Sequence, residues 1–118
     1  GVKPPASLPG SNVLDEQAMA KRNTLFLSNF AHDMASATEP EKSLWTRSCI
    51  HGKWKLVAWV KNPPEIRPWA GGHRHKTGAN LELFDLLADP HETKNLAKQH
   101  PDVVQDLLAR IDGWWKVE

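Results

Sequence analysis

The sequence has little of several features that mark specialised classes of protein. Its 118 residues include a single cysteine, so no disulfide can form within the chain. No apolar run approaches the roughly 18 residues that a membrane-spanning helix needs, and we expect no membrane contact. The 15 basic and 14 acidic residues leave a net charge of +1, so no global field favours nucleic acid.

The remaining composition is that of one globular domain. Hydrophobic residues make up 40% and charged residues 25% of the chain, both ordinary values. Six tryptophans and no tyrosine are unusual, and we expect most of the tryptophans to lie in the core or to cover apolar surface. The chain opens on Gly1 without a methionine or a signal-peptide pattern, so we expect a fragment or a processed product.

The N-terminal third predicts an arm, a short helix and a strand. Residues 1–12 hold three prolines and two glycines, which predicts an extended arm before a domain over residues 13–118. Asn12 is expected to cap a helix over residues 14–22. The β-rich run TLFLSNF at residues 24–30 predicts a strand, with a polar loop or a frayed helical turn after it.

A hairpin is predicted in the middle of the chain. Residues 44–50 and 53–61 have the alternating pattern of strands, and His51-Gly52 between them suits a two-residue connection. The second strand places apolar residues on one face and lysines mostly on the other.

Residues 81–86 predict one more strand, followed by a helix start. Asp89 stands three residues before Glu92, with Pro90 at the first helical position, which is the pattern of a capping box. The sequence therefore predicts a short helix from Pro90 to Ala97.

The chain ends in an amphipathic helix that begins near Pro101. Its apolar positions recur at the spacing of one helical face. They are Val103, Val104, Leu107, Leu108, Ile111, Trp114 and Trp115. Strands followed by one such helix predict an α+β fold, with a small antiparallel sheet of about four strands packed against the C-terminal helix.

Two loops carry candidate site residues. Residues 62–79 form a long segment rich in proline and glycine, and His73, Arg74 and His75 are its chemically dense part. Three interpretations of this segment are open. It is a solvated basic loop, or it contacts an anionic substrate through Arg and His. The third is a metal site formed by the two histidines, for which no third ligand is evident. His32 is a second candidate, with a simple polar loop as the alternative.

The segment NLELFDLLADPHETKNLA at residues 80–97, called here the signature segment, carries a family resemblance. It resembles the closing segment of the sulfatases, formylglycine-dependent enzymes of the alkaline-phosphatase-like superfamily. Residues 47–57 resemble the hairpin, and residues 7–15 the lead-in, of the same C-terminal subdomain. The motif D-P-x-E-x-x-N-L is similar to that of sulfamidase-like members, which act on N-sulfated glucosamine, and occurs across the family.

The catalytic half of a sulfatase is missing from the sequence. The family's nucleophile is a cysteine within C-x-P-x-R, and Cys49 is followed by Ile-His-Gly-Lys. Cys49 is therefore interpreted as a structural strand residue, and no catalytic residue and no metal ligand is assigned to this chain. The resemblance implies that formylglycine and calcium belong to an upstream domain, and we expect no cofactor in the present piece.

The resemblance implies a role for the chain within a larger enzyme. We expect a sulfatase fragment, inactive alone, that packs on an N-terminal catalytic domain and supplies part of the pocket wall for a sulfated carbohydrate. The family also implies a periplasmic or secreted location. The alternative is a free-standing carbohydrate-binding or protein-interaction module with the same fold.

Overall fold

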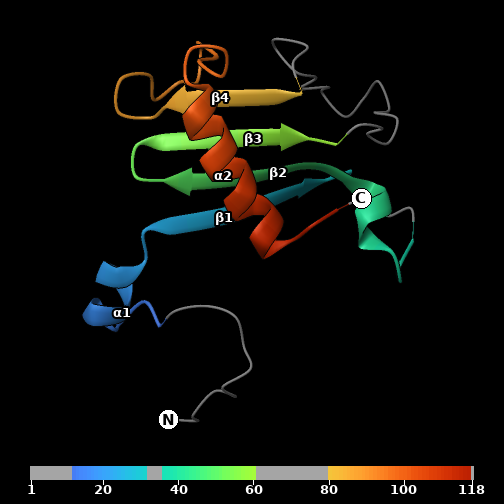
Figure 1. Cartoon of the computed structure of the whole chain (residues 1–118). Coiled ribbons are helices and arrows are strands. Elements are labelled where there is room, and N and C mark those ends of the chain that lie inside the picture. The colour runs from blue at the N-terminus through green and yellow to red at the C-terminus, as the bar shows by residue number, and fades with distance from the viewer. Residues whose placement is uncertain (1–11, 32–35, 61–79, 118) are drawn as a thin grey trace.

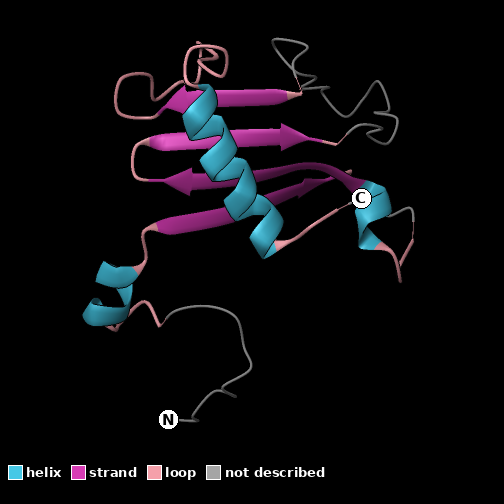
Figure 2. Ribbon diagram, in the orientation of Figure 1, coloured by secondary structure: helices cyan, strands magenta, loops and turns pink. Residues whose placement is uncertain are grey.

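Four antiparallel strands form one sheet, and one long helix crosses a face of it (Figures 1 and 2). The computed structural model describes residues 12–31, 36–60 and 80–117. The elements in chain order are α1 (Glu16–Lys21), β1 (Thr24–Phe30), the 3₁₀ helix η1 (Pro40–Ser43), β2 (Leu44–His51), β3 (Trp54–Trp59), β4 (Leu81–Asp85) and α2 (Pro101–Trp114). The spatial order of the strands is β1-β2-β3-β4. This arrangement is the α+β fold that the sequence predicted.

The hairpin between β2 and β3 sets the register of the sheet. His51 pairs with Trp54, so the two turn residues are Gly52 and Lys53 rather than the predicted His51 and Gly52. Gly52 has a φ of 57°, a left-handed conformation that glycine adopts without a steric cost. The turn therefore lies one residue later than predicted, because the glycine occupies its first central position.

The core lies between one face of the sheet and α2. In the sheet register Phe26, Cys49, Leu56 and Leu83 stand side by side across the four strands. Three apolar residues of α2 pack on this row at helical spacing, namely Val104, Leu107 and Ile111. Cys49, Leu56, Leu83 and Ile111 have no exposed surface. The helical periodicity in the sequence thus identified the buried stripe.

The last turn of α2 is completed by aromatic contacts. Trp114 stacks on Phe26 of β1, with ring centroids 5.1 Å apart. Trp115 was predicted on the helix face, but it lies beyond the helix in an extended conformation, and its N–H donates to the Ile111 carbonyl. Within the described part of the chain, every helix is too short or too polar to cross a lipid bilayer.

The short helix α1 differs from its prediction in its start and its cap. Asp15 is the N-cap, because its carboxylate accepts the Ala18 N–H at 3.0 Å. Asn12 instead caps the preceding turn through the Leu14 N–H. No residue of α1 is buried, and the helix stands beyond β1, away from the core (Figure 1).

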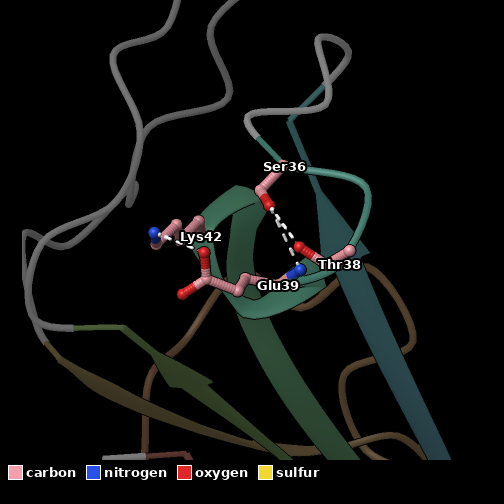
Figure 3. A network of polar contacts seen from close by, with 4 residues as sticks. All are labelled: Ser36, Thr38, Glu39 and Lys42. Atoms are coloured by element: carbon pink, nitrogen blue, oxygen red, sulfur yellow. Dashed lines mark hydrogen bonds and ion pairs between the residues drawn. The ribbon is translucent and has the colours of Figure 1, made fainter.

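The helix η1 replaces the polar loop or frayed turn expected before β2. The Ser36 hydroxyl accepts the Glu39 N–H at 3.2 Å and lies 3.3 Å from the Thr38 hydroxyl (Figure 3). Lys42 pairs with the Glu39 carboxylate at 2.6 Å. These groups are exposed, so they shape the turn more than they stabilise the fold.

Truncation of Leu107 tests the core directly. Leu107 is 1% exposed, so Leu107→Ala is expected to lower the free energy of unfolding by ~2–5 kcal/mol through lost burial and a cavity. Urea denaturation measures the change. Leu87, which is 82% exposed, provides the control, since Leu87→Ala should leave stability within ~0.5 kcal/mol. Equal losses in the two variants would contradict the assignment of this core.

Candidate functional site

The signature segment begins with β4 and continues into the connection to α2. Asn95, near the end of this segment, closes the outer edge of the sheet. The Asn95 side chain accepts the Leu83 N–H and donates to the Leu81 carbonyl, both at 3.1 Å. The Leu96 N–H then donates to the Leu83 carbonyl at 2.8 Å. Asn95 and Leu96 thereby act as a substitute for a fifth strand, a role that the sequence analysis did not foresee.

The aspartate that ends β4 organises the next turn. Asp85 accepts hydrogen bonds from the backbone N–H groups of Leu87 and Ala88, each at 3.1 Å, and pairs with Lys53 Nζ at 2.6 Å. The hydrogen bond from Lys53 is the main reason that the pKa of Asp85 lies below its ordinary value, with the two N–H donors adding to it. The carboxylate is therefore held ionised by structural partners.

The predicted helix over residues 90–97 is absent, so the prediction of a capping box was wrong, although Asp89 does accept backbone N–H groups. The Asp89 carboxylate accepts the N–H groups of Thr93 and Lys94 at 2.7 and 2.9 Å. These bonds, with the Lys94 N–H contributing most, lower the pKa of Asp89. Asp89 thus organises a series of turns, and residues 90–97 contain no helix.

Glu92 explains why the helix does not form. It has a φ of 54°, which lies outside the right-handed helical region. Its carboxylate does not return to the cap. It pairs with Lys55 of β3 at 2.7 and 2.8 Å, and both side chains are about two-thirds buried or more. A long-range ion pair has therefore taken the place of the local capping box.

The face of the sheet opposite α2 holds one buried acid. Glu82 of β4 is only 6% exposed, and its carboxylate accepts the Trp59 indole N–H at 2.9 Å. Trp59 and Lys55 stand on the strand face that carries the lysines, and both are partly buried. Phe84, which is opposite Lys55 in the register, is buried on the same face, so this face combines polar contacts with apolar residues.

Arg47 is a structural ion-pair partner rather than an exposed ligand. Its guanidinium donates from Nη1 to the Asp112 carboxylate at 2.9 Å and to the Trp115 carbonyl. The Arg47 side chain is 11% exposed, and its Nε is buried without a hydrogen-bond partner in the described residues. The strand β2 is thus tied to the end of α2.

Cys49 lacks the properties of a nucleophile. It is fully buried under α2, and burial is the main cause that raises the pKa of its thiol. Only the thiolate attacks a substrate or binds a metal. A protonated thiol without solvent access fits the structural role predicted from the sequence.

The candidate substrate contacts His32, His73, Arg74 and His75 lie outside the described residues, so they stay predictions. Among the residues that are described, no group of three or more His, Cys, Asp or Glu is arranged to hold a metal ion. Cys49 is buried and is not followed by the C-x-P-x-R pattern, so it does not fit a formylglycine precursor.

Removal of the Asn95 amide tests the closure of the β4 edge. Asn95→Ala leaves the Leu83 N–H without its acceptor, and we expect a loss of ~1–3 kcal/mol in unfolding free energy. Lys94→Ala is the matched control, because Lys94 contributes its backbone N–H to Asp89 and that group remains. Urea denaturation of both variants should separate them, and equal stabilities would contradict the assigned role.

The lowered pKa of Asp85 predicts an acid-sensitive contribution to stability. The folded-state pKa lies below the ordinary value of 3.8, so the contribution is complete above that pH and is lost as pH falls through the folded pKa. Asp85→Asn removes the titrating group, and its unfolding free energy should fall less steeply over this acid range. Identical slopes for the variant and the original chain would contradict the prediction.

Comparison with known proteins gives this structure a family context. No protein-family model matches the chain. An N-acetylgalactosamine-6-O-sulfatase of Bacteroides thetaiotaomicron is 39% identical over 72 residues, which are 58% of this chain. The chain spans only 13% of the length of that sulfatase.

A solved structure is also similar in sequence. It is described as concerning the metabolism of multiple glycosaminoglycans by Bacteroides thetaiotaomicron, and the alignment has 36% identity and a TM-score of 0.45. It covers 58% of this chain and 14% of the other. Over 72 residues the chain is therefore homologous to part of a sulfatase, and its α+β fold fits a sulfatase C-terminal subdomain.

Proposed function

We propose that this chain is the C-terminal subdomain of a longer sulfatase, which hydrolyses a sulfate ester or a sulfamate on a carbohydrate. The observation that carries the proposal is the 39% identity to a sulfatase of which the chain spans 13%. A relative of that length leaves room upstream for a complete catalytic domain. Formylglycine and calcium are assigned to that domain, since Cys49 is buried and lacks the C-x-P-x-R sequence around it.

The proposed role of the subdomain is to complete the catalytic domain rather than to break a bond. The polar residues of the signature segment support this role, since Asp85, Asp89, Glu92 and Asn95 all bind partners within the fold. Contact with substrate is proposed for His32, His73, Arg74 and His75. A guanidinium suits sulfate because it can donate two parallel hydrogen bonds.

The proposed substrate is a sulfated amino sugar. The relative's name concerns O-sulfated N-acetylgalactosamine, whereas the D-P-x-E-x-x-N-L motif resembles members that act on N-sulfated glucosamine. The name favours an O-sulfated sugar, and a comparison of turnover on the two classes by the longer polypeptide decides between them. A periplasmic or secreted location is proposed with it.

The isolated chain is expected to hydrolyse no sulfate ester. Release of sulfate from an aryl sulfate and from a 6-O-sulfated amino sugar measures this, with Cys49→Ser as the paired variant. Both chains should equal the buffer blank, because a buried, protonated thiol offers no nucleophile. A rate that disappears in Cys49→Ser would contradict the proposal.

The size of the native polypeptide tests the larger claim. An antibody raised against residues 80–97 should detect, in an extract of the source cells, a species several times the mass of the 118-residue chain. A species of the chain's own mass would contradict the sulfatase proposal. The free-standing module would then be favoured.

A further inference from the structure

The two outer edges of the sheet differ in whether other residues cover them. The outer edge of β4 is closed by Asn95 and Leu96 through three hydrogen bonds. The outer edge of β1 has no partner strand among the described residues. Natural sheets protect a free edge with charged residues, proline or a bulge. The sequence of β1, TLFLSNF, has neither charge nor proline, and its register irregularity lies only at Asn29/Phe30.

Most of the exposed large apolar residues belong to β1 or to the segment just before α1. Of the seven large hydrophobic residues described as exposed, five lie between residues 13 and 30, namely Val13, Leu14, Leu25, Leu27 and Phe30. Leu25 and Leu27 are 38% and 46% exposed, and they alternate with Phe26, which packs under α2. They therefore project from the face opposite the helix.

We propose that the outer edge of β1 with Leu25 and Leu27, called here the β1 surface, is where the rest of the parent polypeptide packs. This inference rests on the proposed function and names the surface through which the subdomain joins its partner. The partner is an upstream domain of the same chain that offers an apolar patch or a strand edge. The short span of this chain relative to the sulfatase provides the length for it.

A partner on the same polypeptide is favoured over a second copy of this chain. Covalent linkage gives two surfaces an effective concentration of the order of millimolar, well above ordinary protein concentrations. The same argument explains an unprotected edge: a strand that is always covered within its own polypeptide does not need charges against aggregation.

Cysteine labelling in the longer native polypeptide tests the β1 surface. Leu27→Cys and Leu87→Cys introduce thiols at two positions that are exposed in this structure, at 46% and 82%. If the upstream domain covers β1, a maleimide should label Leu27→Cys at least about tenfold more slowly than Leu87→Cys. Leu25→Cys should behave like Leu27→Cys, and buried Cys49 should stay unlabelled while the subdomain is folded.

Each other outcome overturns the inference. Similar labelling rates at the two positions, with Cys49 still protected, would show that the β1 surface is open. Slow labelling that becomes fast on dilution would identify a second copy as the occupant. The labelling rate does not depend on enzymatic activity. A polypeptide without sulfatase activity in which Leu27→Cys is protected would therefore contradict the proposed function but still support packing on the β1 surface.

Discussion

One row of side chains, formed by Phe26, Cys49, Leu56 and Leu83, is central to the fold because α2 packs on it. Side chains alternate between the faces of a strand, so a slip of one residue in any strand would replace part of this row with polar groups. Gly52 fixes the register at the hairpin, and Asn95 fixes it at the last edge. The sheet and the helix therefore depend on the same alignment.

The signature segment is distinctive in sequence because it solves a backbone problem. After β4 the chain must turn, cover an open edge and reach the start of α2 within residues 86–100. Asp85 and Asp89 satisfy N–H groups in the turns, and Asn95 satisfies the strand edge. A motif of this kind can be distinctive because its polar residues hold the backbone in place. They need not take part in a reaction.

Much of the fold was predictable because its signals are local and periodic. The bounds of β1 follow from a run of residues that favour strands, and the buried positions of α2 follow from a period of 3.6 residues. The failed helix after Asp89 has a long-range cause, since Lys55 lies 37 residues before the glutamate that it binds. Asn95 was missed for a similar reason, because an isolated asparagine gives no sign of which strand edge it will meet.

The candidate site was predictable only as a list of residue types. His32, His73, Arg74 and His75 were chosen because they are dense in groups that bind anions, and such density does not specify an orientation.

The tie between Arg47 and the end of α2 also has a consequence for how the chain folds. The last turn of α2 contains no basic residue, and the charge that complements the helix dipole comes from Arg47, 65 residues before Asp112. The final turn can gain this stabilisation only after β2 has been placed. The backbone hydrogen bonds of α2 are local, but its last turn is held by a residue far away in the sequence. Completion of the helix is therefore coupled to assembly of the sheet in one cooperative step.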